Sequence, residues 1–197
     1  MTAAAVGLTD EPRTTWLART RVRATVAAGG IGVGALAAAA PYTSGRTVPV
    51  SDWVDKSDLA IAAHVAVGMS FVLVGVVAWS LRPENRVGPL MAATGFVYFS
   101  IDLGWISTPA TFVAADEWRG VFYAFLFWLL LAFPSGRLES RADRIYVSAF
   151  FAYVLLVRPF PSAAFYDPHT EGPFDAPANP LLVRADPELN TSVDRWL

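Results

Sequence analysis

His64 and Asp102 are the two residues whose types and positions suggest chemistry in this chain. Each is the single acidic or basic side chain in a long apolar run, His64 in 59–81 and Asp102 in 89–107. Ionisable groups inside such runs are costly in hydrocarbon and usually face a partner or a cavity. A histidine beside a carboxylate can change its charge near neutral pH, which would suit sensing. We therefore interpret the two residues as a candidate sensing pair.

Two less specific interpretations stay open. The pair could act only as structural glue, or each side chain could reach the membrane interface separately. His64 lies about 8 Å inward from Leu59, and Asp102 lies about 10 Å inward from Pro109, so direct pairing is feasible if the two helices pack side by side. One His and one Asp are too few for a metal site or a nucleophile–base set. We therefore expect no catalytic residue, metal site or cofactor site in this chain.

The segment 82–88 between the two apolar runs is short, charged and rich in turn-forming residues. The flanking runs have the length that a helix needs to cross about 30 Å of hydrocarbon. Pro83 disfavours helical geometry at Arg82, which ends the first helix. Gly88 and Pro89 can open the second, because proline is tolerated in a first turn. The segment is therefore predicted to join two antiparallel membrane helices.

The composition is that of an integral membrane protein. The chain has 197 residues, of which 54% are hydrophobic and 16% are charged, whereas soluble domains carry about 25% charged residues. The net charge is −2 and there is no basic tract, which argues against nucleic-acid binding. The absence of cysteine excludes disulfides and thiol chemistry. We predict an all-α fold, a polytopic bundle of transmembrane helices.

Apolar runs and breakers predict the other helices. The first is expected from Leu17 or Ala24 to Ala40, ended by Pro41. Its Gly30 and Gly34 have a spacing that allows close helix approach, although an Ala/Gly-rich sequence also produces it by chance. Asp58 is expected to cap the second helix.

A short outer loop is expected at 110–117, followed by a helix over 118–133 that the segment 134–136 ends. The last apolar run, 145–157, is too short to span. Its helix must continue to Tyr166 with a kink, or Arg158 must snorkel to the outer surface. Trp53, Trp105 and Trp118 are expected to form an interfacial belt, with a ligand cage as the alternative.

The basic residues predict the orientation. Nine of the 15 lie in the expected inner segments: Arg13, Arg19, Arg21, Arg23, Arg82, Arg86, Arg137, Arg141 and Arg144. The positive-inside rule then gives a multi-pass protein of the cell membrane with a cytoplasmic N-terminus and about five spans. The expected organisation is a polar cytoplasmic segment 1–16, a transmembrane domain 17–166, and an extracytoplasmic Pro-rich segment 167–197 that leads to a sixth helix beyond the C-terminus.

Two loop sequences resemble those of a protein family. The segment 82–88, R-P-E-N-R-V-G, resembles the R-R-P-x-N-R-I-G-W-L hairpin of bacterial two-component sensor histidine kinases, and 133–138, F-P-S-G-R-L, resembles their later F-P-D-G-R-L hairpin. Asn179-Pro180-Leu181 resembles the N-P-L of their last outer loop. Ser135 and Pro89 depart from the pattern. The motif residues are Arg82, Pro83, Asn85, Arg86, Gly88, Phe133, Pro134, Gly136 and Arg137.

The resemblance implies the membrane-embedded input domain of such a kinase, truncated before its kinase domain. No catalytic domain is recognisable in the chain, while the parent protein is expected to be an ATP-dependent protein-histidine kinase. ATP and Mg are expected only for that missing domain. The implied partners are the lipid bilayer, a second copy in a homodimer, and a response regulator.

Two alternatives to this function stay open. The chain could be a transporter subunit, or the membrane anchor of another output domain such as a nucleotide cyclase. The loop arginines could contact lipid head groups or a kinase domain, although fixing the orientation explains them more simply.

Overall fold

The computed structural model describes residues 11–43, 57–105, 108–171 and 178–189. The regular structure in these residues is entirely helical, which confirms the predicted all-α fold. The main helices are α1 (Glu11–Thr43), α2 (Asp58–Leu81), α3 (Val87–Tyr98), α4 (Pro109–Ala132) and α5 (Arg141–Ala152). α3 continues into the 3-10 segment η1 (Phe99–Trp105). α5 continues through a π-helical segment, η2 (Tyr153–Val157), into α6 (Pro159–Phe165), and α7 (Pro168–Glu171) is a single turn.

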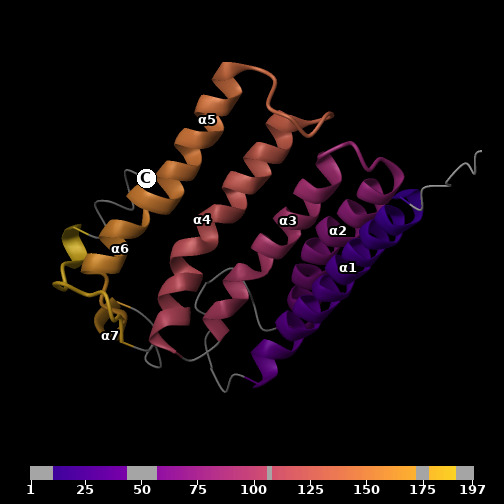
Figure 1. Ribbon diagram of the computed structural model, residues 1–197. Helices are drawn as coiled ribbons and strands as arrows, with labels where there is room; N and C mark the ends of the chain where they lie inside the picture. The colour runs from indigo at the N-terminus through magenta and orange to yellow at the C-terminus, as the bar shows by residue number, and fades with distance from the viewer. Residues whose placement is uncertain (1–10, 44–56, 106–107, 172–177, 190–197) are drawn as a thin grey trace, which may run out of the picture.

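The helices run alternately up and down (Figure 1). The N-terminal end of α1, the α2–α3 loop and the α4–α5 loop lie at the same end of the bundle. α2 packs on both α1 and α3, α4 packs on α3 and η1, and α5 packs on α4. Short connections between helices favour this antiparallel order of neighbours. We call this end, with its two short loops, the hairpin end.

The predicted limits of the first helix are wrong at both ends. α1 begins at Glu11 rather than Leu17 and continues through Pro41 to Thr43. Contacts beyond the proline hold the last turn: the Thr43 hydroxyl donates to the Ala39 carbonyl, and the Tyr42 hydroxyl donates to the Asp58 carboxylate at the start of α2. A proline in a final turn is therefore compatible with continued helix here. Residues 1–10 of the predicted polar segment lie outside the described residues.

Glycines set the distance between α1, α2 and α3. A Cβ on Gly30 would lie 2.4 Å from Cγ1 of Val72 on α2, and one on Gly34 would lie 2.8 Å from the sulfur of Met69. Gly30 and Gly34 therefore do pack closely against α2, which is one of the two interpretations that their spacing left open. Between α2 and α3 the contact is backbone to backbone, because a Cβ on Gly75 would lie 2.5 Å from the amide nitrogen of Ala92. Glycine at such positions lets helices approach closely.

α2 ends at Leu81 as the sequence predicts, and it begins at Asp58. Its cap is Ser57 rather than the expected Asp58, since the Ser57 hydroxyl accepts from the amide of Ala60 at 3.3 Å. A residue immediately before a first turn is well placed to bond these free amides, and serine is a preferred type there.

The outer loop expected at 110–117 is wrong, because α4 already begins at Pro109. Proline suits a first helical position, where its missing N–H has no helical partner to lose. α5 begins at Arg141, four residues before the predicted start at Ile145. A capping box explains this: the Ser140 hydroxyl accepts from the Asp143 amide, and the Asp143 carboxylate accepts from the Ser140 amide.

The last helix follows the first of the two predicted alternatives and continues beyond Val157. The amide of Arg158 donates to the carbonyl of Tyr153, five residues back, at 2.9 Å. This wider turn precedes Pro159, whose ring would crowd the carbonyl of a regular α-helical turn and which has no amide hydrogen. The helical path then reaches Phe165.

Two helical spans in the described residues, Arg19–Thr43 and Asp58–Leu81, are long and apolar enough to cross a membrane. Val87–Leu103 and Gly120–Ala132 are shorter apolar helices. Only 22% of the most apolar part of each long span is buried inside the protein, and large apolar side chains such as Leu36, Leu130 and Leu156 are exposed. Extended apolar surface of this kind marks a membrane or partner contact. The fold is therefore compatible with a membrane location.

Candidate functional site

The structure brings the two predicted polar residues together. His64 Nε2 lies 3.0 Å from Asp102 Oδ2, within hydrogen-bond distance, and each side chain is 11% exposed. His64 lies on α2, and Asp102 lies on η1. The two residues are 38 positions apart in the chain, so the α2–α3 hairpin is what places them side by side.

Aromatic rings enclose the pair. The His64 ring lies 4.8 Å from the ring of Tyr98 and 5.9 Å from that of Phe99, measured between centroids. Phe122 on α4 lies 5.1 Å from Tyr98, so the enclosure reaches a third helix. Such a low-polarity surrounding strengthens a hydrogen bond and makes an unpaired polar group costly. The His64–Asp102 pair therefore lies where α2 meets η1, and Tyr98 connects it to α4.

Gly68 explains how η1 comes close to α2. A Cβ on Gly68 would lie 2.3 Å from Cζ of Phe99, so the phenyl ring occupies the space that a side chain would fill. Gly68 is one helical turn from His64, and Phe99 opens the 3-10 segment that carries Asp102. The 3-10 geometry was not predicted from the sequence, which indicated a continuous helix to Ser107. Such segments inside helices often mark a hinge or a strained site.

The arrangement is a hydrogen bond between an imidazole and a carboxylate on two packed elements. No group of three or more His, Cys, Asp or Glu side chains that could hold a metal ion is found in the part of the chain that the structure describes. Histidine changes charge more readily around neutral pH than other side chains. The contact between His64 and Asp102 was predicted, whereas the role of Tyr98 and Phe99 was missed. The spacing of Tyr98 and Asp102, four residues apart, was the available signal.

The two loop motifs meet at the hairpin end. Asn85 Nδ2 donates to the carbonyl oxygen of Pro134 at 2.9 Å, while Asn85 Oδ1 accepts from the amide of Val87 at 2.9 Å. Gly136 is buried, with φ of +74°, and a Cβ there would lie 2.3 Å from the amide nitrogen of Val87. Only glycine adopts this backbone without strain. The sequence did not predict this contact between the loops.

The other motif residues have simpler positions. Arg82, Pro83, Arg86, Phe133, Pro134 and Arg137 are exposed. Gly88 is buried, and a Cβ on it would lie 2.4 Å from the amide nitrogen of Trp79. Position 88 therefore requires glycine, because α3 approaches α2 closely there.

Asn179 of the third motif acts in the same way as Asn85. Its Nδ2 donates to the carbonyls of Ala163 and Tyr166, at 3.0 and 2.9 Å, and its Oδ1 accepts from the amide of Leu181 at 2.9 Å. The side chain fastens the segment after α7 to the end of α6. All three motifs thus contain residues that hold loops in place.

The predicted tryptophan belt is corrected in part. Trp105 is only 5% exposed, so it packs inside the protein instead of facing an interface. Trp53 lies outside the described residues, as does the side chain of Trp118.

No family model, curated protein or solved structure matches this chain.

Proposed function

We propose that this chain is the membrane-embedded input module of a bacterial two-component sensor histidine kinase. In this proposal it crosses the cell membrane about five times, with the N-terminus and the hairpin end in the cytoplasm. The parent protein would be an ATP-dependent protein-histidine kinase that acts as a homodimer and passes phosphate to a response regulator. The chain itself would contribute sensing and no catalysis.

The contact between the two loop motifs is the observation that carries this proposal. The motifs were identified by their resemblance to one family, and they are 49 residues apart at the Asn85–Pro134 bond. Because they meet at one end of the bundle, the two motifs form parts of one structural unit, as the resemblance implies. The arginines of both loops lie at that end, which agrees with a cytoplasmic location under the positive-inside rule.

The polar pair supplies a route for a signal. His64 lies in the second turn of α2, whereas the hairpin end is at the other end of this helix, and Asp102 on η1 is bonded to His64. α2 and α3 connect the two places without a break in α2. A change in the His64–Asp102 bond would shift η1 relative to α2 and so alter the loops. A ligand can shift such an equilibrium only by binding the two arrangements differently.

The test uses the full-length product of the gene that encodes this chain, reconstituted in proteoliposomes with radiolabelled ATP and Mg²⁺. We expect acid-labile phosphohistidine, and transfer of the label to a response regulator from the same organism. His64→Leu should change the autophosphorylation rate, whereas Ser70→Ala, at an exposed position on α2, should leave it unchanged. Absence of phosphohistidine from an active-site-intact, folded preparation would overturn the kinase assignment. Nucleotide cyclase activity would identify the alternative output.

A further inference from the structure

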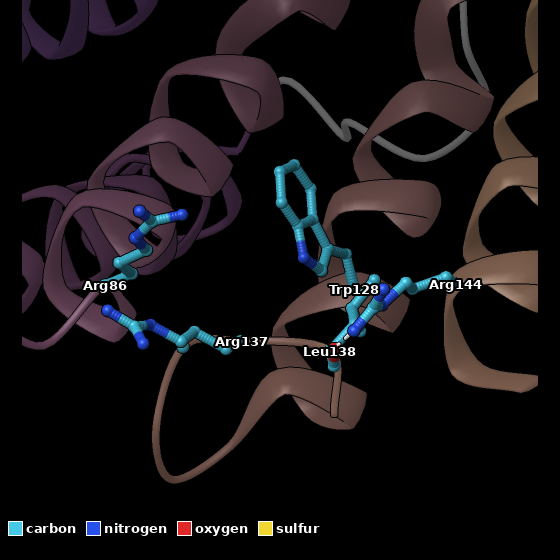
Figure 2. Close-up of a pocket in the computed structure, with 6 residues that line it drawn as sticks. Arg86, Trp128, Arg137, Leu138 and Arg144 are labelled. Atoms are coloured by element: carbon cyan, nitrogen blue, oxygen red, sulfur yellow. Dashed lines mark hydrogen bonds between the residues drawn. The ribbon is translucent and has the colours of Figure 1, made fainter. Parts of the chain in front are cut away.

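An open pocket at the hairpin end is lined by three arginines from three segments (Figure 2). It has a volume of about 450 Å³ and is lined by Arg86, Trp128, Gly136, Arg137, Leu138 and Arg144. Arg86 comes from the start of α3, Arg137 from the α4–α5 loop, and Arg144 from the first turn of α5. The pocket therefore depends on the docking of the two loops.

The charges around the pocket are unbalanced. Three of the six lining residues are arginines, and none is Asp or Glu. Among the residues that the structure describes, none of the three forms an ion pair with a carboxylate. In Figure 2 the guanidinium groups of Arg86 and Arg137 lie on the same side of the pocket, and Arg144 lies on the other. Like charges on one side of a site repel each other, and a bound anion removes that repulsion. The planar fork of arginine matches the oxygen atoms of a phosphate group.

The pocket walls are held in place. Gly136 is in backbone contact with Val87, and Asn85 bonds to Pro134, which together fix Arg137 relative to Arg86. On the other side, Arg144 Nε donates to the carbonyl of Leu138 at 3.2 Å, and Figure 2 shows this side chain reaching from α5 back to the loop. A site fixed before binding loses less conformational entropy when its ligand arrives.

The remaining walls are apolar. Trp128 and Leu138 are half-buried and pack against the core cluster of Val87, Leu90, Leu129 and Ala132. A cationic rim above an apolar wall suits a phosphate group attached to an apolar molecule. Tryptophan is also common at the head-group level of membranes, and basic pockets on the cytoplasmic side of membrane helices bind anionic head groups.

We propose that this pocket binds a phosphate group, as carried by the head group of an anionic phospholipid. The assignment does not depend on the sensor function, because any membrane protein of this geometry would present the same site. It also differs from general attraction of basic loops to an anionic surface. Arg82 and Arg141 are exposed in the same two loop regions, yet neither lines the pocket.

Those two residues provide matched controls. The purified chain would be reconstituted in phosphatidylcholine vesicles with increasing fractions of phosphatidic acid, and separately titrated with inorganic phosphate in neutral vesicles. We expect Arg86→Gln and Arg137→Gln each to weaken binding to the anionic vesicles by about tenfold. Arg82→Gln and Arg141→Gln should weaken it by less than about twofold, as expected for loss of a surface charge. Arg137→Lys should recover only part of the lost binding, because lysine keeps the positive charge but lacks the planar guanidinium group that matches two phosphate oxygens.

The two probes distinguish the sources of the phosphate. Binding to phosphatidic acid alone identifies a lipid head group, whereas saturable binding of inorganic phosphate as well identifies a soluble phosphate compound. Equal losses for the lining and control variants would overturn the site in favour of general electrostatic attraction, as would no binding of either probe. Melting curves in neutral vesicles check that each variant is folded. Arg144→Gln is not used alone, since it also removes the bond to Leu138.

Discussion

His64 Nε2 on α2 and Asp102 Oδ2 on η1 lie 3.0 Å apart, each in a side chain that is 11% exposed. His64→Leu and Asp102→Asn should each lower the melting temperature in detergent, because each leaves one largely buried polar group without its partner. The double variant should lose less stability than the two single variants together, with a coupling free energy of about 1–2 kcal/mol. Strictly additive losses would show that the two side chains act separately, and would remove the proposed sensing pair.

Gly30 and Gly32 make a matched test of the α1–α2 contact. A Cβ on Gly30 would lie 2.4 Å from Val72, whereas one on Gly32 would meet no atom within 4 Å. Gly30→Ala should destabilise by about 1–3 kcal/mol because Val72 has few alternative rotamers. Gly32→Ala should be neutral or stabilise by up to about 1 kcal/mol, since alanine favours helix over glycine. Equal effects of the two changes in thermal melts would contradict the packing.

Gly75 should be less tolerant than Gly30, because its neighbours belong to the backbone of α3. A Cβ there would lie 2.5 Å from the Ala92 amide nitrogen and 2.8 Å from the Gly88 carbonyl oxygen. A backbone cannot change rotamer, so Gly75→Ala must move α3 away from α2. We expect the free energy of unfolding to fall by about 3 kcal/mol or more. The coupling free energy measured in the His64–Asp102 double-mutant cycle should also become smaller. A smaller loss than for Gly30→Ala would argue against the close approach of α2 and α3.

Asn85 should hold the two loops of the hairpin end together. Asn85→Ala removes two hydrogen bonds and should destabilise by about 1–2 kcal/mol. Asn85→Asp keeps the acceptor for the Val87 amide but turns a carboxylate oxygen towards the Pro134 carbonyl, so it should be at least as harmful. Glu84→Ala, at an exposed neighbour, is the control.

The loop separation gives a second measurement for Asn85. Spin labels at positions 84 and 139, both exposed, should show a broader distance distribution in Asn85→Asp than in the parent. An unchanged distribution would mean that Gly136 packing alone holds the loops. In that outcome the bond between Asn85 and Pro134 would have no role in docking.

Single-cysteine labelling tests the orientation, and the chain has no cysteine of its own. Glu84→Cys and Glu139→Cys should react with an impermeant reagent only after the cells are permeabilised. Ala185→Cys, at an exposed position after α7, should react in intact cells. Labelling of position 84 from outside would reverse the proposed topology. Different sidedness of positions 84 and 139 would contradict the shared hairpin end.

The loop at 82–86 was predictable because its signals are local. Pro83 ends one helix, and a short polar loop obliges its flanking helices to run antiparallel. Because a helix rises by a constant amount per residue, His64 and Asp102 are expected at similar distances from the outer ends of these two helices. Direct contact between them was therefore feasible from the chain order, and the structure shows it. The predicted breaks at Pro41 and at 110–117 were wrong, since a proline limits a helix only where its neighbours offer no other support.

Features that join distant segments needed the tertiary structure. Three such features join the α2–α3 loop region to the α4–α5 loop region: the bond from Asn85 to Pro134, the backbone contact of Gly136 with Val87, and the pocket of Arg86, Arg137 and Arg144. They result from the combined packing of many side chains and from glycines whose role is visible only beside their neighbours. The sequence by itself determined the all-helical fold and two of the about five predicted apolar spans, and it singled out His64 and Asp102, because these follow from residue type and the length of apolar runs. Which loops dock, and which arginines then share one pocket, was decided by packing between elements far apart in the chain.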